Sequence, residues 1–265
     1  MTTWRDWACI VAAAAVLAGC TMSAVQTSSG SDYLARTPAI GLPPAAAGEA
    51  TTNLNEAVRR AADVEPTLQF PTKICLARIE RFGLTEPPPD ELAQWEQLSE
   101  KLGPSVGEFA VLNPLVASLA ATTYTHPANE APLARMVADI RLGAAREHCD
   151  TAFIYEPSAT GKTSNTPLQL LDLTIVGYFI VPSTGVQADG TVQALLVDVR
   201  SGYPYAQLTG QSHNETFTTG NTRGNAMVSH EDIARLSAVA DLIKKIPDTI
   251  STLRTRLSDR KSSEK

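Results

Sequence analysis

The stretch Thr72-Lys-Ile-Cys-Leu-Ala-Arg-Ile-Glu80 (TKICLARIE) begins the regular part of the chain. Its run of aliphatic residues predicts a β-strand. A helix is predicted next, over 90–102, because apolar residues recur there at helical spacing and Gly103-Pro104 follows as a stop signal. The apolar residues of this predicted helix are Leu92, Trp95, Leu98 and Leu102.

The alternation of strand and helix continues toward the middle of the chain. GEFAVLNP (107–114) predicts a second strand, Pro132 begins a second predicted helix, and TAFIYE (151–156) predicts a third strand. Strands and helices that alternate at these lengths favour parallel βαβ units with right-handed crossovers.

The pattern changes after residue 168. LQLLDLTIVGYFIVP (168–182) predicts a long apolar strand. The run is too short for a membrane-spanning helix and contains Asp172, so we expect a buried, central strand of the sheet instead. Two hairpin signals, Asp189-Gly190 and Ser201-Gly202, separate the strand-like runs that follow. The second half of the sheet is therefore predicted to be an antiparallel meander.

The last helix is predicted to begin at Ser229-His-Glu-Asp232, which has the layout of a capping box with Asp in place of the usual Glu. Apolar residues then recur at alternating steps of three and four, and Pro247 interrupts them. They are Leu236, Val239, Ile243, Ile246, Ile250, Leu253 and Leu257. We expect this helix to pack on the protein's own sheet; the alternative is a partner or self-association helix, chiefly after Pro247.

These elements together predict an α+β fold. We expect a mixed sheet of about six strands, arranged as βαβαβ and then the antiparallel meander, with two or three helices on one face and a long C-terminal helix. The globular domain is expected to span 71–258, and 259–265 to be a polar tail.

The N-terminal stretch MTTWRDWACIVAAAAVLAGC (1–20) has the layout of a signal peptide. Arg5 lies in a short polar head, and the apolar run that follows is about half as long as a membrane span. The run ends in Leu17-Ala18-Gly19-Cys20, which resembles the bacterial lipobox, where the cysteine is acylated before cleavage. We predict a lipoprotein signal peptide over 1–19 and a lipidated Cys20; the alternatives are an ordinary signal peptide or a short core helix.

Lipidation implies a place in the bacterial cell envelope. Thr21, and not Asp, follows the cysteine, so by analogy with enteric bacteria we expect an outer-membrane lipoprotein that faces the periplasm. The net charge is −6 and no basic patch is present, so nucleic acid is not an expected partner. Attachment to the lipid bilayer must come from acyl chains such as palmitate on Cys20. Residues 20–70, rich in Ser, Ala, Pro and Thr, predict a flexible tether with a short helix over 54–64.

Two cysteines remain besides Cys9 in the leader and Cys20. An oxidising periplasm favours a disulfide between Cys75 and Cys149, whereas the alternative is two isolated buried thiols. The loop between them, 149 − 75 = 74 residues, would contribute about 4 kcal/mol in the loop-entropy model.

SATGKTS (158–164) follows a predicted strand, as a phosphate-binding loop would. That motif needs a glycine five positions before Gly161, but Glu156 stands there, and Pro157 removes another N–H donor. No ATP pool is expected outside the inner membrane. We therefore expect a solvated turn here and no cofactor.

No motif predicts catalysis or metal binding. Glu147-His148-Cys149 could supply one or two metal ligands, but no second His or Cys lies at ligand spacing, and no serine lies in a Gly-x-Ser-x-Gly elbow. Asp198 and Arg200 are expected to stabilise a hairpin as a pair, and Asp172 to occupy a polar edge position. We therefore expect no catalytic, cofactor-binding or metal-binding residues.

Several segments together resemble the rhombotarget lipoprotein family: LLDLTIVGYFIVP, ALLVDVRSGYPYAQLTGQSH and the terminal helix, preceded by the lipobox and SSGSDYL. That family is associated by gene occurrence with the rhombosortase protein-sorting system, and its biochemical role is not established. The order of elements also looks like the fold of the TolB N-terminal domain and of lipoproteins in curli secretion and penicillin-binding-protein activation. The resemblance implies architecture and location, and no catalytic residue.

The sequence thus predicts a lipid-anchored, non-catalytic accessory or scaffold of the cell envelope, linked to protein sorting or secretion, with an unidentified envelope protein as partner. The first alternative is a subunit of an outer-membrane secretion pore, which would need membrane-spanning hairpins. The second is an envelope hydrolase or metal enzyme, which would need histidines and carboxylates that converge in one cleft.

Overall fold

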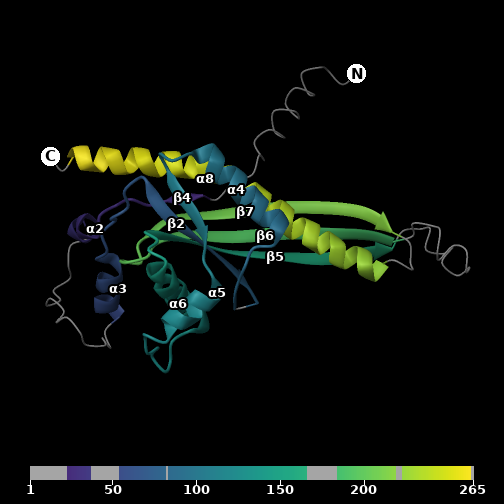
Figure 1. Ribbon diagram of the computed structural model, residues 1–265, viewed down its shortest axis with the longest axis horizontal. Coiled ribbons are helices and arrows are strands. Elements are labelled where there is room, and N and C mark those ends of the chain that lie inside the picture. The colour runs from purple at the N-terminus through teal and green to yellow at the C-terminus, as the bar shows by residue number, and fades with distance from the viewer. Residues whose placement is uncertain (1–22, 37–53, 82, 166–183, 219–222, 264–265) are drawn as a thin grey trace, which may run out of the picture.

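The computed structural model describes residues 23–36, 54–81, 83–165, 184–218 and 223–263 (Figure 1). The described strands form one seven-stranded mixed sheet, accompanied by six helices. The strands are β1 (Ala24–Val25), β2 (Thr72–Glu80), β3 (Gly83–Thr85), β4 (Gly107–Val111), β5 (Thr151–Asn165), β6 (Thr184–Asp198) and β7 (Pro204–Thr218). The helices are α2 (Gly30–Arg36), α3 (Leu54–Ala62), α4 (Pro89–Leu102), α5 (Pro114–Ala121), α6 (Pro132–Arg146) and α8 (Arg223–Ser263). The predicted α+β class with a long C-terminal helix is confirmed.

The sheet combines the two predicted kinds of pairing. Its order is β1-β7-β6-β5-β2-β3, and β4 also pairs with β2. β2 is parallel to both β4 and β5, as expected for βαβ units, because α4 and α6 lie in the connections. β5, β6 and β7 are antiparallel neighbours, which confirms the meander.

Helices cover both faces of the sheet around β2, whereas the sequence predicted them on one face. α4 and α8 contribute to the core on the face that carries Leu76 and Phe153. α5 and α6 contribute to a second core on the opposite face, around Ala77 and Ile154. The physical reason is that successive side chains of β2 alternate between the faces and both sets are apolar, so each face needs its own cover.

β5, β6 and β7 extend beyond β2 as a three-stranded projection (Figure 1). The turn predicted over 158–164 is wrong, because this segment pairs with residues 185–191 inside β5 and β6. Tertiary pairing and the cover of α8 outweigh the weak strand propensity of these Gly- and Ser-rich segments. The apolar run 168–182, with Asp172, lies outside the described residues.

Of the two predicted hairpin signals, one is confirmed. Ser201-Gly202 joins β6 to β7, and Gly202 has a φ of 77°, a conformation that glycine adopts without steric cost. Asp189-Gly190 is not a turn and lies within β6.

α8 is a single helix of 41 residues that packs against β5, β6 and β7. The predicted start at 229–232 is wrong, because the chain is already helical from Arg223, and Pro247 lies inside the helix without ending it. Ile250 and Leu253, beyond Pro247, are buried in the core beside the sheet. The prediction that this helix packs on the protein's own sheet is therefore confirmed. None of the described helices has the length and hydrophobicity that crossing a membrane requires.

Two glycines allow α8 to approach the sheet closely. A Cβ at Gly190 of β6 would lie 2.2 Å from the carbonyl oxygen of Ala234. A Cβ at Gly210 of β7 would lie 2.3 Å from the carbonyl oxygen of Ala238. Any side chain at these positions would have to push the helix away from the strands.

The predicted flexible tether over 20–70 is corrected for the described parts of that range. β1 pairs with β7 at Ala206 and Gln207, and Leu68 is buried in the core. The short helix predicted over 54–64 is observed as α3. Pairing satisfies backbone groups at the sheet edge that would otherwise be exposed, and burial of Leu68 adds hydrophobic stabilisation. Residues 23–36 and 54–70 thus include segments that belong to the folded domain.

Candidate functional site

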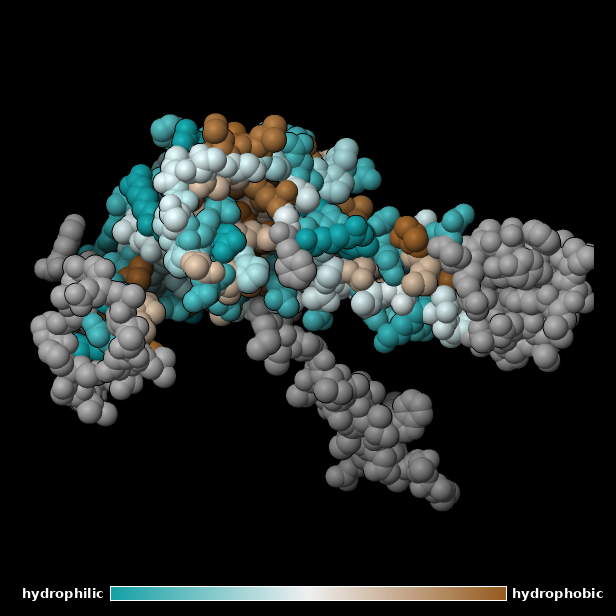
Figure 2. Space-filling model, turned by 90° about the horizontal axis from the view of Figure 1, so that it is seen from below, coloured by the Kyte–Doolittle hydropathy of each residue, from teal (hydrophilic) through white to brown (hydrophobic). Residues whose placement is uncertain are grey.

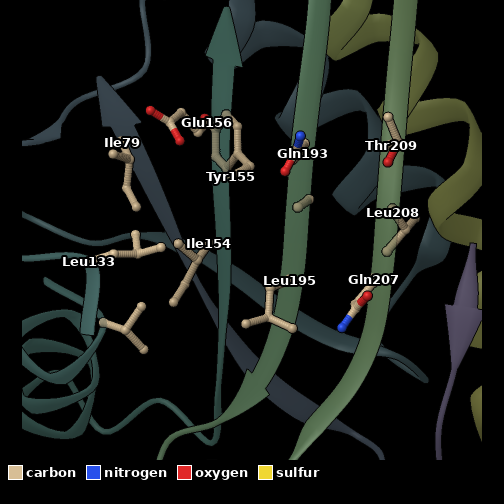
Figure 3. Close-up of a pocket in the computed structure, with 12 residues that line it drawn as sticks. Ile79, Leu133, Ile154, Tyr155, Glu156, Gln193, Leu195, Gln207, Leu208 and Thr209 are labelled. Carbon is tan, nitrogen blue, oxygen red and sulfur yellow. The ribbon is translucent and has the colours of Figure 1, made fainter. Parts of the chain in front are cut away.

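The main candidate site is a groove on the sheet face that α6 only partly covers (Figure 3). Its volume is about 380 Å³. β2, β5, β6, β7 and α6 supply its lining, which is Ile79, Leu133, Val137, Ile154, Tyr155, Glu156, Gln193, Ala194, Leu195, Gln207, Leu208 and Thr209. Figure 2 views the molecule from the side of α5 and α6 and shows hydrophobic residues set between hydrophilic ones near the middle of the body.

One half of the groove is apolar. Ile79, Ile154 and Leu195 come from the adjacent strands β2, β5 and β6, and Ile154 is directly opposite Leu195 in the register. Leu133 and Val137 lie one helical turn apart on α6 and line the same groove. Leu133 faces Ile154 in Figure 3. Leu133 is 59% exposed, whereas Ile154 is 6% exposed. An exposed apolar side chain beside a buried apolar floor is typical of a surface that a partner covers.

The other half of the groove is polar. Glu156, Gln193 and Thr209 form one row across β5, β6 and β7, since Gln193 is paired with both neighbours in the register. Gln207, in the next row, is paired with Leu195. These side chains can exchange hydrogen bonds with a ligand, and the exposed carboxylate of Glu156 can attract a cation.

Tyr155 borders the groove, but its hydroxyl lies in a buried polar cluster on the α4 side of the sheet. The hydroxyl donates a hydrogen bond to Oε1 of Glu91, and Nε of Arg78 lies 3.3 Å from Oε2 of the same carboxylate. Burial, reinforced by the negative charge of Glu91, raises the pKa of Tyr155 well above its ordinary value. This cluster joins α4 to β2 and β5, and its burial gives it a structural role.

Asp198, predicted to pair with Arg200, instead organises the β6–β7 turn through other contacts. Its Oδ1 accepts hydrogen bonds from the backbone N–H groups of Arg200 and Ser201, at 2.9 and 2.7 Å. Its Oδ2 accepts from Thr67 Oγ1 and Tyr205 OH, at 2.7 and 3.0 Å. Burial alone would raise the pKa of Asp198, but these hydrogen bonds outweigh it and lower the pKa. Asp198 and Arg200 thus stabilise the hairpin through the backbone N–H of Arg200, whereas the Arg200 guanidinium lies 4.0 Å from Oδ1 of Asp150.

The Gly-Lys-Thr segment lies in β5, and its backbone follows a strand ladder. The N–H of Gly161 donates to Oε1 of Glu231 on α8 at 3.0 Å. A carboxylate therefore occupies the position that a phosphate would need, and successive N–H groups of a strand do not converge on one anion. Lys162 is exposed and is opposite Gln187 in the register.

The histidines do not gather in one place. His126 lies between Glu130 and Asp139 near the start of α6, His213 contacts Asp189 on the projection, and His148 follows the end of α6. Within the described ranges, no three His, Cys, Asp or Glu side chains are grouped so that they could hold a metal ion.

Cys75 and Cys149 form a disulfide with a Cα–Cα distance of 5.8 Å. Cys75 lies in β2, and Cys149 precedes the neighbouring parallel strand β5. Both residues are buried in the core between the sheet and α6. The predicted lipidation site, Cys20, lies outside the described residues.

The groove is not predicted by any local pattern in the sequence. The polar row could have been suspected from β6, because polar residues alternate there with buried ones, as in a strand with one open face. These polar residues are Gln187, Asp189, Thr191 and Gln193. The apolar wall could not have been predicted from the sequence. Leu133 and Leu195 are 62 positions apart (195 − 133 = 62) and line the same groove only when α6 packs beside the sheet.

No protein-family model and no curated protein matches this chain. Among solved structures, a minor lipoprotein from Acinetobacter baumannii is 13% identical, covering 69% of this chain and 92% of its own length with a TM-score of 0.32. A PelC dodecamer from Paraburkholderia phytofirmans is 11% identical over 65% of this chain and 93% of its own, with a TM-score of 0.24. Lipoprotein GNA1162 from Neisseria meningitidis is 13% identical over 62% and 99%, with a TM-score of 0.26. Similarity this distant carries no conclusion about function.

Proposed function

We propose that this chain is a lipid-anchored protein of the bacterial cell envelope that holds a segment of a partner protein in the groove, without catalysing a reaction. It would be an outer-membrane lipoprotein facing the periplasm, in the rhombotarget lipoprotein family, and would act as an accessory in protein sorting or secretion. The anchor is supported by the lipobox ending at Cys20 and by the Cys75–Cys149 disulfide, since disulfides persist in oxidising compartments.

The observation that carries the binding role is the combination of an apolar wall and a polar row within one groove. Leu133, Ile154 and Leu195 offer apolar contact, and Gln193 and Glu156 offer hydrogen bonds and a negative charge beside it. An extended segment of the partner would place alternate side chains on the apolar wall, and its backbone would face the side-chain amides of Gln193 and Gln207. We therefore expect a partner segment with apolar residues at alternate positions and a basic residue that reaches Glu156.

Photo-crosslinking in cells tests this role. A photoreactive phenylalanine analogue replaces Leu133 at the mouth of the groove, and the matched control carries it at Val228, which is 61% exposed on α8. We expect one adduct from position 133, absent from position 228, whose cross-linked peptide contains an apolar segment with a neighbouring basic residue.

Two further variants decide whether the adduct depends on the groove. Leu195→Asp places a charge on the apolar wall and Glu156→Lys reverses the charge of the polar row, so both should abolish the adduct. Glu156 is exposed, so its variant should keep the melting temperature of the parent. Leu195 packs against the second core, so its variant should melt at a lower temperature but remain folded. An adduct that persists in both folded variants, or that forms equally from position 228, would refute the groove as the binding site.

A further inference from the structure

The proposed lipid anchor lies close in sequence to a strand that is fixed in the sheet. Ala24, the first residue of β1, pairs with Gln207 of β7. Four Cα–Cα steps separate Cys20 from Ala24, and they span at most about 14 Å when fully extended. An acyl chain on Cys20 would therefore hold β1 near the bilayer surface, in contrast to the long tether that the composition predicted.

The last turns of α8 lie beside this anchored strand. Arg256 donates a hydrogen bond to the carbonyl oxygen of Val25 at 2.7 Å. Glu65 accepts from Ser29 through Oε1 at 2.7 Å and from Arg260 through Oε2 at 3.1 Å. These contacts fix the segment after the anchor against the C-terminal end of α8, so that end lies near the bilayer as well.

The last turns of α8 are basic although the whole chain carries a net charge of −6. Residues 254–261 contain four basic residues and one acidic residue, which gives 4 − 1 = +3. The basic residues are Arg254, Arg256, Arg260 and Lys261, and the acidic residue is Asp259. Arg254, Arg256 and Lys261 are exposed. Basic side chains also complement the dipole at a helix C-terminus, but that role leaves their outer donors available to an anion.

The projection at the other end has the opposite charge. Its described strands carry Glu156, Asp189 and Glu215 against Lys162, which gives −3 + 1 = −2 when His213 is neutral. A surface of anionic lipid headgroups therefore attracts the end that holds the anchor and repels the projection.

We propose that the end of the molecule formed by β1 and the last turns of α8 lies against the bilayer, where Arg254, Arg256 and Lys261 contact the anionic phosphates of lipid headgroups. The projection then points away from the membrane, and the groove, whose polar row lies at the base of the projection, stays open to the partner. This orientation rests on the proposed lipidation of Cys20 and adds to it the surface that faces the lipid.

Energy transfer to the bilayer surface tests the orientation. The full-length product is purified from cells, its acylation is checked by intact mass, and it is placed in phosphatidylcholine vesicles that contain phosphatidylglycerol and a headgroup-labelled acceptor lipid. The donor dye is attached at Ser258→Cys on α8 or at Ser164→Cys near the tip of β5, both exposed positions. Glu231, which contacts β5 at Gly161, is 258 − 231 = 27 residues from Ser258 on α8. The two dyes are thus separated by about 40 Å along the helix.

We expect energy transfer from position 258 to exceed that from position 164 by about twofold or more, given a difference of about 40 Å in distance from the lipid surface. In pure phosphatidylcholine, where only the short anchor holds this end at the surface, a flexible Gly-Ser linker inserted between Ser23 and Ala24 should remove most of this difference. Lys261→Glu should lower the transfer from position 258 in vesicles with phosphatidylglycerol but not in pure phosphatidylcholine, and the charge-matched control Lys162→Glu should leave it unchanged.

The outcomes separate the orientation from the anchor. Equal transfer from both positions in an acylated, vesicle-bound protein would overturn the proposed orientation and leave the anchor standing. If the linker does not change the difference in energy transfer between the two positions, the proposed orientation is likewise overturned and the anchor stands. A protein without acylation at Cys20 that fails to bind vesicles would overturn both proposals.

Discussion

Nε of Arg78 lies 3.3 Å from Oε2 of Glu91, and the two residues are only 5% and 3% exposed. Arg78 belongs to β2 and Glu91 to the first turn of α4, so this ion pair joins the first strand and the first helix of the βαβ unit. A buried ion pair is weak evidence for net stabilisation. Arg78 also contacts Glu80 at 2.7 Å, so removal of Glu91 leaves the arginine a partner but takes away the acceptor of the buried Tyr155 hydroxyl.

Glu91→Ala should therefore lower the free energy of unfolding by about 1–3 kcal/mol. Glu96→Ala, an exposed position on the same helix, should change it by less than about 0.5 kcal/mol. Urea unfolding followed by circular dichroism measures both. Equal effects of the two substitutions would show that the buried pair is not important for stability.

His126 provides a pH-dependent contact between its loop and α6. Its Nδ1 lies 2.6 Å from Glu130 Oε2 and its Nε2 lies 2.8 Å from Asp139 Oδ1, and both nitrogens can donate only when the ring is protonated. The hydrogen bond to Glu130, with a smaller contribution from Asp139, raises the pKa of His126 above its ordinary value.

Because this pKa is raised in the folded state, the stabilisation is fully present below the unfolded pKa of about 6.5 and is lost as the pH rises through the folded pKa. The difference in melting temperature between the parent and His126→Gln should therefore be largest near pH 5.5 and shrink toward about pH 9. A difference that stays constant over this range would contradict the charged contact.

The Cys75–Cys149 disulfide closes a loop of 74 residues. Replacing both cysteines by alanine should destabilise the protein by about 4 kcal/mol in the loop-entropy model. Reducing agent should lower the melting temperature of the parent and leave that of the double variant unchanged. If reduction has no effect on the parent, the cross-link does not form in the protein as expressed.

Gly190 sets the distance between α8 and β6. Gly190→Ala would bring a Cβ to 2.2 Å from the Ala234 carbonyl oxygen, so we expect a loss of about 2 kcal/mol or more from overpacking. The control is Gly83→Ala, where the nearest atom to the new Cβ is 3.6 Å away. Similar stability of the two variants in urea would contradict the close contact between helix and sheet.

The elements that the sequence predicted well are those whose signal is local. Trp95 and Leu98 recur at helical spacing and are buried on α4, and the run around Ile74 is a core strand. Segment 158–164 was mistaken for a turn because its strand state depends on distant partners. β6 pairs with it along its whole length, and Glu231 of α8 binds the N–H of Gly161.

The candidate site depends on distant packing even more strongly. The cysteine pair was predictable because few cysteines remain once the leader and Cys20 are set aside. The groove was not, because its apolar wall combines Leu133 of α6 with Leu195 of β6, and neither residue stands out in its own segment. The register that aligns Glu156, Gln193 and Thr209 is likewise visible only when the strands are paired.

The most direct test of the account is the mass of the N-terminal peptide of the protein purified from membranes. We predict a mature chain that begins at Cys20 and carries acyl chains, and a Cys20→Ala variant that stays an unlipidated, uncleaved precursor, because the thiol is the acceptor and cleavage follows its modification. An unmodified Cys20, or a Cys20→Ala variant that matures normally, would contradict the lipid anchor on which the proposed envelope function rests.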